Sequence, residues 1–264
     1  MKQIIGYKWK KWKPTLVINN GSKMELELLN QRVDFTFGKL FCTGFNKNGK
    51  HFDCSTTMEI ASGYQCKHCA IRDDFTKCVH CNGNACANDK QRSSCFSNSY
   101  YVYLAGFGSL LKVGMSFEYR FLQRFVEQGA DFAARVAYVK DGRNARKTEQ
   151  LIKNTLKLTD RVLGAQKHNE LFADPTITMQ NMQNAIAMLK QCKFNYLIEP
   201  DIFDLRAYYN LDKLLEKPEA FDVKENTTLA GEVVAAKGNL VFVKNENGFL
   251  SVNAHRLVGR ELIA

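Results

Sequence analysis

The chain has 264 residues, 45% of them hydrophobic and four of them proline, a composition that is typical of a folded globular protein and excludes a disordered or collagen-like chain. Residues 1–170 carry 27 basic and 15 acidic side chains, whereas residues 171–264 carry 10 and 12, so the formal net charge of +10 belongs to the first two thirds. An uncharged apolar run of the roughly 18 residues that span a membrane does not occur, and the N-terminal stretch has no apolar segment of signal-peptide length. We therefore expect a cytoplasmic protein without a membrane partner.

The basic first part of the chain predicts a polyanionic partner, since lysines and arginines that neutralise phosphates release counterions. The first candidate segment is "YKWKKWK" (residues 7–13). In an extended strand each face would combine a tryptophan with lysines, and such a face can stack bases and hold phosphates. A surface strand whose lysine stems cover apolar area would show the same pattern. The candidate nucleic-acid-binding residues here are Lys8, Lys10, Lys11 and Lys13.

Eight of the nine cysteines lie in one stretch, which begins at Cys42 and ends at Cys95, while Cys192 stands alone. The stretch contains two CxxC motifs, "CKHC" and "CVHC", which are eight residues apart and could supply four thiolates to one tetrahedral zinc ion. The other four cysteines could form a second site. Disulfides are the less expected use in a chain without an export signal. The candidate zinc ligands are Cys42, Cys54, Cys66, Cys69, Cys78, Cys81, Cys86 and Cys95.

Three histidines in the same stretch, His51, His68 and His80, leave ligand sets of three cysteines and one histidine open. A histidine inside a CxxC motif more often faces solvent or phosphate, so we expect cysteines as the ligands. A site that is filled by protein ligands is structural, because the ion organises loops that lack a core of their own. We expect one or two structural zinc ions.

The stretch after the cysteines predicts a β-hairpin, a helix, a strand and a second helix. Residues 100–105 alternate as a strand, "GFG" (residues 106–108) is a candidate turn, and "LLKVG" returns. Ser116 is a candidate N-cap for a helix that Gly129 would end. "ARVAYVK" (residues 134–140) reads as a strand, and Asn144 opens the second helix, which carries a glutamate in its second turn.

The last part of the chain has a different character. Apolar residues at three-to-four spacing predict a helix from about Thr178 to Cys192, with Cys192 as a buried thiol. From Leu229 onward the sequence reads as short strands that "KGN" and "NENG" turns join, and these would form a small β-module. Such modules often bind nucleic acid, but the near-neutral charge of this segment favours one that caps a neighbouring domain.

The hairpin, helix, strand and helix resemble the core of the GIY-YIG nucleases. The first signature of that family would correspond to "YVY" (residues 101–103), with the family tyrosine at Tyr103. The second would correspond to "KVG" (residues 112–114), with the family glycine at Gly114. Lys112 then stands where many members have a second tyrosine, although some subgroups also have lysine there.

The resemblance also implies the catalytic roles. The family's helix arginine would correspond to Arg124, or less closely to Arg120, its metal-binding glutamate to Glu149, and a late asparagine to Asn169. In such hydrolysis the glutamate holds Mg²⁺ or Mn²⁺, the tyrosine helps to activate water, and the arginine steadies the phosphate. We therefore take Tyr103, Lys112, Arg124 and Glu149 as candidate catalytic residues. Each residue also has an ordinary interpretation, as a packed tyrosine or as surface charges in solvent or ion pairs.

A second resemblance covers nearly the whole chain. The strings "LKVGMSFEYRFLQRFVEQGAD", "KTEQLI" and "GEVVAAKGNLVFVKNENGFLSVNAHRLVGRELI", together with the cysteine-rich stretch, resemble a prokaryotic family of unassigned function. Phe125 stands where that family usually has tryptophan. This resemblance implies a common architecture and supplies no activity.

The fold class that we expect is α+β, in four segments. These are N-terminal strands with the cysteine-rich zinc region (1–99), a GIY-YIG-like core (100–172), a helical connecting region (173–226) and the small β-module (227–264).

Two functions follow as hypotheses. The first is a zinc protein that binds nucleic acid and acts as a metal-dependent endonuclease on DNA or RNA. The second is a catalytically silent binder of DNA or of structured RNA, such as tRNA or ribosomal RNA, within a ribonucleoprotein or beside another protein partner. A plain protein-interaction module, whose basic charge is incidental, is a third interpretation.

Overall fold

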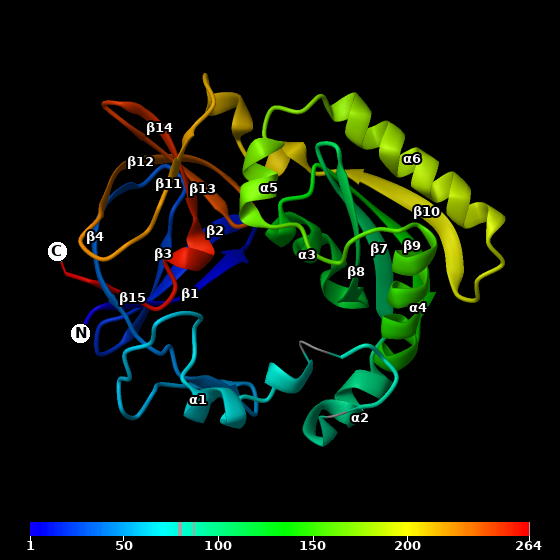
Figure 1. Ribbon diagram of the computed structural model, residues 1–264, viewed down its shortest axis with the longest axis horizontal. Coiled ribbons are helices and arrows are strands. Elements are labelled where there is room, and N and C mark those ends of the chain that lie inside the picture. Colours follow the sequence, from blue (N-terminus) through cyan, green and yellow to red (C-terminus); the bar gives the residue numbers. More distant parts are fainter. Residues whose placement is uncertain (79–80, 87, 264) are drawn as a thin grey trace. The chain divides into compact units, whose positions relative to one another are not determined.

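The computed structural model describes residues 1–78, 81–86 and 88–263, and the chain divides into two compact units (Figure 1). Unit 1 comprises residues 1–76 and 209–264, and unit 2 comprises residues 77–208. Unit 2 is therefore one continuous insertion into unit 1. The fold is a mixed α+β structure, and in the described part of the chain no helix is long and apolar enough to cross a membrane.

Unit 1 is built on a nine-stranded sheet with the strand order β11-β14-β13-β12-β4-β15-β1-β2-β3. Neighbouring strands are antiparallel except β11 and β14, which are parallel. The strands are β1 (Gln3–Lys10), β2 (Lys13–Asn19), β3 (Lys23–Glu27), β4 (Arg32–Leu40), β11 (Glu219–Phe221), β12 (Thr228–Lys237), β13 (Leu240–Asn245), β14 (Gly248–Asn253) and β15 (Arg260–Leu262).

Strand β4 joins the two ends of the chain within this sheet. It pairs with β12 on one side and with β15 on the other. Its sequence alternates as a half-buried strand requires, since Val33, Phe35 and Phe37 are buried while Arg32 and Asp34 are exposed. The C-terminal strands, which the sequence presents as a module of their own, thus complete a sheet with the N-terminal ones.

Unit 1 also contains a small hairpin and a short helix, which carry part of the cysteine-rich stretch. The hairpin consists of β5 (Phe45–Lys47) and β6 (Lys50–Phe52), and helix α1 spans Lys67–Arg72. These elements are too short to bury an extensive apolar core, so packing alone gives them little stability.

Unit 2 is built on a four-stranded antiparallel sheet with the order β10-β9-β7-β8. Its strands are β7 (Tyr100–Phe107), β8 (Leu110–Phe117), β9 (Phe132–Val139) and β10 (Leu197–Asp204). Its helices are α2 (Asp89–Ser97), α3 (Phe121–Gln128), α4 (Gly142–Thr155), α5 (Gly164–Asn169) and α6 (Pro175–Gln191).

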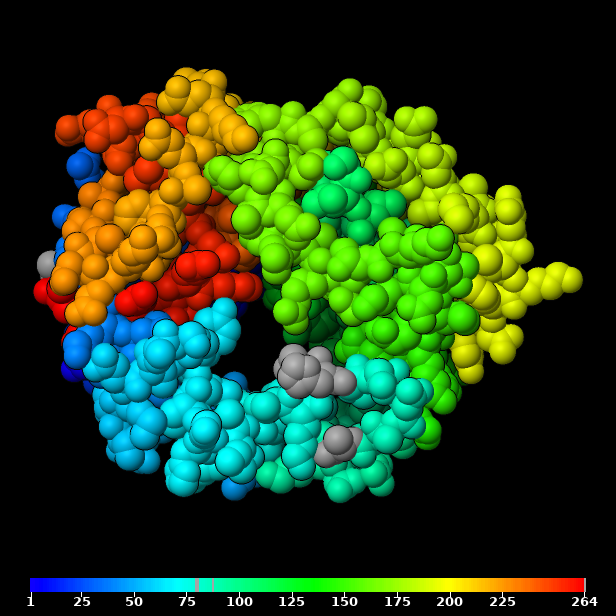
Figure 2. Space-filling model, viewed as in Figure 1, coloured from blue at the N-terminus to red at the C-terminus, as the bar shows by residue number. Residues whose placement is uncertain are grey.

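The two faces of this sheet are covered by different helices. Val102 and Leu104 share a buried cluster with residues of α4 and α6, such as Ile152 and Met182, and Figure 2 shows α6, in yellow-green, on the outside of the unit. The alternate residues of β7 face the other way, toward α3, and the Tyr103 ring lies 4.8 Å from the ring of Phe125. The predicted hairpin and the alternation along its first strand are therefore confirmed.

The hairpin turns one step later than the "GFG" motif suggests. Gly106 is still part of β7 and pairs with Leu111, so Gly108 and Ser109 form the turn, and Gly108 has a positive φ of 56°. A Cβ on Gly106 would lie 2.5 Å from Cγ2 of Thr178, which explains a glycine inside the strand.

The helix that was expected to start at Ser116 begins later. Phe117 is still in β8, where it pairs with Tyr100 and its ring lies 4.8 Å from the tyrosine ring. A 3₁₀ turn (Glu118–Arg120) follows, and α3 starts at Phe121. Its end is as predicted, because Gly129 takes the left-handed conformation with φ of 73°.

Two other helix starts also differ from the expectation by a few residues. Helix α4 begins at Gly142 and not at Asn144, because the Asp141 carboxylate caps it and accepts a hydrogen bond from the Asn144 backbone N–H at 2.7 Å. Helix α6 begins at Pro175, where Asp174 is the cap and proline suits the first helical position.

Candidate metal centre and active site

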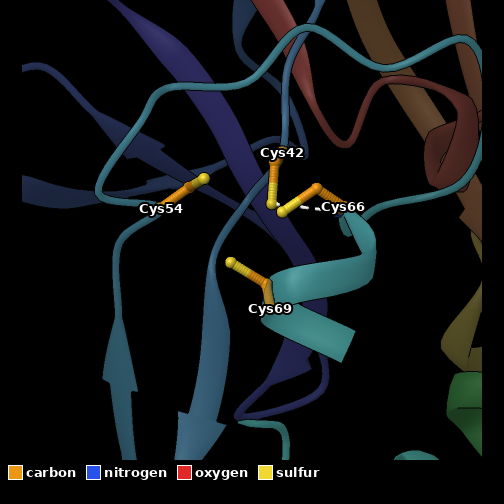
Figure 3. Close-up of side chains that lie close together, drawn as sticks. All are labelled: Cys42, Cys54, Cys66 and Cys69. Atoms are coloured by element: carbon orange, nitrogen blue, oxygen red, sulfur yellow. Dashed lines mark hydrogen bonds between the residues drawn. The ribbon is translucent and has the colours of Figure 1, made fainter. Parts of the chain in front are cut away.

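Four cysteine side chains of unit 1 converge on one point (Figure 3). Cys42 follows the end of β4, and Cys54 follows the end of β6. Cys66 immediately precedes α1, and Cys69 lies in its first turn. The four sulfur atoms are all within 4.8 Å of one another, and the cysteines are not joined in disulfides. We call these four residues the Cys42 cluster.

The geometry of the Cys42 cluster fits a tetrahedral zinc ion. Four sulfurs at about 2.3 Å from zinc lie about 3.8 Å from one another, which agrees with this close group. Cys42 Sγ also accepts hydrogen bonds from the backbone N–H groups of Gly44 at 3.4 Å and Cys66 at 3.2 Å. Donors of this kind stabilise the negative charge of a metal-bound thiolate. The cluster can therefore hold a metal ion such as zinc.

The electrostatics of the cluster favour a bound cation. Burial raises the pKa of Cys42 and of Cys69, since an apolar setting disfavours the thiolate. Burial acts in the same direction at Cys54, but hydrogen bonds from Met58 and Thr56 outweigh it and lower the pKa of Cys54 to about 6. Four adjacent thiolates would repel one another, and a divalent ion removes that cost.

The pairing of the CxxC motifs differs from the expectation. The "CKHC" thiols join Cys42 and Cys54, whereas Cys78 and Cys81 of "CVHC" belong to unit 2. The reason is local: the β5–β6 hairpin places Cys42 and Cys54 at its two ends, next to the start of α1. Sequence spacing alone does not contain this contact.

The two described histidines of this stretch, His51 and His68, do not complete the Cys42 cluster. His51 Nε2 lies 3.4 Å from the Asp53 carboxylate, and burial lowers the pKa of this imidazole. His68 is exposed on α1. His80 lies outside the described residues.

A second group of side chains in unit 2 surrounds Tyr103, and we call Tyr103, Lys112, Arg124 and Glu149 the Tyr103 site. Tyr103 is 1% exposed on β7, and its hydroxyl accepts a hydrogen bond from Gln128 Nε2 at 2.8 Å. Burial raises the pKa of Tyr103, which therefore stays protonated near neutral pH. The charge of Arg124 acts to lower this pKa, and that of Glu149 acts to raise it.

Gly114 makes room for the Tyr103 side chain. The two residues are paired across the hairpin, and a Cβ on Gly114 would lie 2.5 Å from the Tyr103 hydroxyl oxygen. A larger residue at the glycine of "KVG" would therefore clash with Tyr103, a constraint that the sequence could not show.

Lys112 lies two residues before Gly114 on the same face of β8 and is 9% exposed. Burial is the main cause that lowers the pKa of Lys112 to about 8; the charge of Arg124 acts in the same direction, and that of Glu149 opposes both. An ammonium group is thus held in a poorly solvated place beside a carboxylate, an arrangement that is typical of functional sites as well as of structural ion pairs.

Glu149 is the buried carboxylate of the site and is 3% exposed on α4. It forms an ion pair with Arg146, one turn earlier on the same helix. Burial raises the pKa of Glu149, while the charges of Arg146 and Lys112 act to lower it.

The arginines of α3 border the site. The Arg124 side chain is 45% exposed, lies 3.7 Å from the Glu127 carboxylate, and acts on the pKa of both Tyr103 and Lys112. Arg120 pairs with the same carboxylate at 2.8 Å. Arg124 thus has one side toward the buried residues and one toward solvent.

Sequence reasoning missed two partners, Gln128 and Arg146. Gln128 lies four residues after Arg124, and Arg146 lies three residues before Glu149, so each shares a helix face with a candidate residue. That spacing is the signal that could have identified them. Asn169 is exposed at the end of α5.

The N-terminal lysines Lys8, Lys10 and Lys13 have acidic partners on strand β3. Lys8 and Lys10 pair with Glu25, and Lys13 pairs with Glu27 at 2.5 Å. The chain turns at Lys11, which has a positive φ of 48°, so residues 7–13 do not form one strand. Trp9 is 3% exposed, and its indole N–H donates to the Gly238 carbonyl oxygen at 2.7 Å.

The fit of Tyr103 against Gly114 gives a prediction. Gly114→Ala should displace the tyrosine ring and lower the free energy of unfolding by about 1–3 kcal/mol, as overpacking of a core does. Urea unfolding monitored by tyrosine fluorescence measures this. Gly6→Ala is the matched control, since its Cβ would meet Val17 at an ordinary 3.6 Å. Equal losses in the two variants would show that Tyr103 is not held against Gly114.

Comparison with known proteins gives one match. No curated protein and no solved structure matches the chain. The family model described as "Protein of unknown function (DUF2797)" matches residues 30–261, which span strands of unit 1 and the whole of unit 2. The chain therefore belongs to the DUF2797 family.

Proposed function

We propose that this protein is a zinc-containing nuclease that uses Mg²⁺ or Mn²⁺ to cleave phosphodiester bonds in DNA or RNA, with the Tyr103 site as its catalytic centre. The observation that carries the proposal is the burial of Tyr103, Lys112 and Glu149 on β7, β8 and α4, which pack against one another, with Arg124 on the adjoining helix α3. The sequence order of these elements is the one on which the resemblance to GIY-YIG nucleases rests. Zinc in the Cys42 cluster would be structural, because its four ligands all come from the protein.

In this proposal Glu149 is the residue that holds the catalytic metal. A single carboxylate binds Mg²⁺ weakly, and this ion keeps several waters and relies on substrate phosphate as a further ligand. When bound, the ion supplies positive charge to the phosphate oxygens as the bond breaks. Glu149, which pairs with Arg146 in the structure, would hold the ion through its carboxylate.

The other residues of the site would act on the phosphate and on the attacking water. Arg124 reaches solvent and can contact a phosphate oxygen, where a charge-assisted hydrogen bond is strong. Tyr103 stays protonated because burial raises its pKa, so its hydroxyl orients the water through a hydrogen bond. The pKa of Lys112 is lowered to about 8, so a fraction of this side chain is a neutral amine near neutral pH. That amine can accept a proton from the attacking water.

Lys112 also gives a prediction on stability. Its pKa is about 8 in the folded protein and about 10.4 in an unfolded chain, so the unfolded state binds more protons between these values and stability rises with pH across that window. Lys112→Met should remove this rise, increase the free energy of unfolding near pH 7 by about 1–3 kcal/mol, and abolish cleavage. Urea unfolding near pH 7 and near pH 10 measures the first two effects.

The control for Lys112→Met is Lys190→Met, which changes a lysine that is 54% exposed in the same unit. It should leave stability and cleavage nearly unchanged. A Lys112→Met variant that is less stable than the control would show that the ammonium stabilises the fold and is not held there at a cost.

A catalytically silent nucleic-acid binder is the second candidate function. It is favoured by Lys112, which replaces the second tyrosine of many GIY-YIG nucleases, and by the ion pair that Glu149 already makes with Arg146. The basic residues of the first 170 positions would then dock on structured RNA or on DNA.

The experiment that separates these functions measures binding and cleavage together. Fluorescently labelled single- and double-stranded DNA and RNA are titrated with zinc-loaded protein at several salt concentrations, with and without Mn²⁺. Affinity that falls steeply with salt supports a nucleic-acid partner, since each neutralised phosphate adds to the slope. Binding with Mn²⁺-dependent cleavage supports the nuclease, binding alone supports the silent binder, and no binding at moderate salt overturns both.

A further inference from the structure

The four remaining clustered cysteines lie in unit 2, apart from the Cys42 cluster in the sequence. Cys78 ends a 3₁₀ turn (Thr76–Cys78), Cys81 and Cys86 lie in the loop that follows, and Cys95 lies on α2. The Cys81 backbone N–H donates to the Cys78 carbonyl oxygen at 3.2 Å, so the backbones of these two cysteines lie close together. The Asn88 side-chain amide donates to Cys78 Sγ at 3.1 Å, and Cys86 Sγ donates to the Asn88 carbonyl oxygen at 3.4 Å.

Asn88 therefore joins two of the thiols directly. An amide N–H that donates to a cysteine sulfur is a common companion of a metal-bound thiolate, because it stabilises the sulfur charge and fixes its orientation. Asn88 itself is only 6% exposed, so these contacts are shielded from water.

Cys95 completes the group from the other side. Its side chain lies at the first turn of α4, where the loop residues Gly83 and Asn84 also make contacts. Cys95 Sγ also contacts the start of α4 closely, because a Cβ on Gly142 would lie 2.4 Å from this sulfur. A glycine at the first position of α4 is thus required by the thiol.

Helix α2, which carries Cys95, has no buried apolar face that would stabilise it. None of its nine residues is buried, and a helix of this length is marginal in water without a packed face. It lies beside α4 (Figure 1). A metal ion that ties Cys95 to the loop would supply the missing stabilisation, as structural zinc does in small domains.

We infer that Cys78, Cys81, Cys86 and Cys95 form a second zinc site, and that this site fastens the loop and α2 to the first turn of α4, the helix that carries Glu149. The four donors are all thiols, and sulfur ligands in this number select zinc over the hard cations Mg²⁺ and Ca²⁺. The negative charge of four thiolates would also lie near the N-terminus of α4, where the helix dipole is favourable to it.

Other contacts link the same loop to α4. Arg143 Nε donates to the Gly83 carbonyl oxygen at 3.0 Å, and an Arg143 terminal N–H donates to the Asn84 carbonyl oxygen at 2.8 Å. Gly83 packs so closely that a Cβ there would lie 2.8 Å from the Arg143 carbonyl oxygen. The loop between Cys81 and Cys86 therefore rests on the turn of α4 that Cys95 contacts. Loss of the ion should loosen this turn, two turns before Glu149.

Metal content tests the inference without nucleic acid, so the nuclease proposal can fail while this one stands. Native mass spectrometry of protein purified with zinc should show about two ions per chain. Cys78→Ser/Cys81→Ser should retain about one ion, as should Cys66→Ser/Cys69→Ser in the Cys42 cluster, and Cys192→Ser should retain both. A wild type that never binds more than one ion per chain would overturn the inference. So would a Cys78→Ser/Cys81→Ser variant that binds as many ions as the wild type.

Two further measurements keep the test decisive if a variant does not fold. Metal-free wild-type protein titrated with Co²⁺ should develop thiolate-to-cobalt absorption until about two equivalents are bound, and saturation at one equivalent would contradict a second site. In the Cys78→Ser/Cys81→Ser variant, amide hydrogens of residues 142–149 should exchange faster than in Cys192→Ser. Equal exchange would show that the ion does not fasten α4.

Discussion

Glu149→Gln is expected to lower metal-dependent cleavage on the order of 100-fold or more, a loss comparable to removal of one electrostatic group from an active site. Glutamine keeps the size of the side chain and can still accept a hydrogen bond from Arg146, but it has no charge to offer a divalent cation. Burial raises the pKa of Glu149, which shows that the buried charge is costly, so the variant should be at least as stable as the wild type. Single-turnover cleavage over a range of Mn²⁺ concentrations measures the loss, and thermal unfolding verifies the fold.

The control for Glu149→Gln is Glu199→Gln, the same change at a carboxylate that is 81% exposed in unit 2. It should cleave at the wild-type rate. Nucleic-acid affinity without metal should change little in either variant, because Glu149 is 3% exposed. If Glu149→Gln cleaved as fast as Glu199→Gln, the carboxylate would not hold the catalytic metal.

Cys66→Ser/Cys69→Ser has the largest expected effect on stability. Structural zinc contributes apparent binding free energies of about 10–16 kcal/mol in zinc-finger peptides, which is comparable to the whole of the about 5–15 kcal/mol that typically separates a folded domain from its unfolded state. The apolar core around the Cys42 cluster is small and consists of the cysteines with Phe45 and Ile60. The variant should therefore lose the ion of this cluster, and residues 41–73 should lose their ordered structure.

Hydrogen exchange localises this loss, since amides of residues 41–73 should lose protection while those of β7 and β9 keep it. A strong chelator should have the same effect on the wild type, and added zinc should reverse it. Cys192→Ser is the control for a lost thiol. Retained protection in residues 41–73 after the ion has been removed would show that the cluster is not structural.

Local features of unit 2 could be predicted from the sequence. Alternation in "YYVYLA" identifies β7, and Gly129 identifies the end of α3, because these patterns depend on neighbouring residues. The start of α3 was placed too early because Phe117 is held in β8 by Tyr100, a residue 17 positions away. Tertiary packing decides such boundaries, and capping preferences do not.

Long-range pairing could not be predicted. The contact of β4 with β12 joins residues 192 to 200 positions apart, and no local pattern in either strand specifies its partner. The grouping of the Cys42 cluster could not be predicted for the same reason. Its four cysteines are all candidate ligands in the sequence, but the β5–β6 hairpin decides that they meet. The pattern of residues 7–13 suggests base stacking by its tryptophans, but Trp9 is buried. Its indole N–H donates to the carbonyl oxygen of Gly238, more than 200 positions later in the chain.

The Tyr103 site combines features that could be predicted from the sequence with features that could not. Its four residues could be chosen from the sequence because they follow the order of a known motif, and they lie on β7, β8, α3 and α4 of unit 2. The steric role of Gly114, the hydrogen bond from Gln128 and the ion pair with Arg146 required coordinates. The roles of these residues in catalysis remain predictions.

Cleavage of nucleic acid at the Tyr103 site, as we propose it, requires a divalent metal. The measurement that tests it most directly is the incubation of zinc-loaded protein with end-labelled single- and double-stranded DNA and RNA, with Mg²⁺, with Mn²⁺ and without either, followed by separation of the products by size. We expect shorter products only when Mg²⁺ or Mn²⁺ is present, and we expect no shorter products with Glu149→Gln. Intact substrate under every condition in which the protein is shown to bind it would contradict the claim.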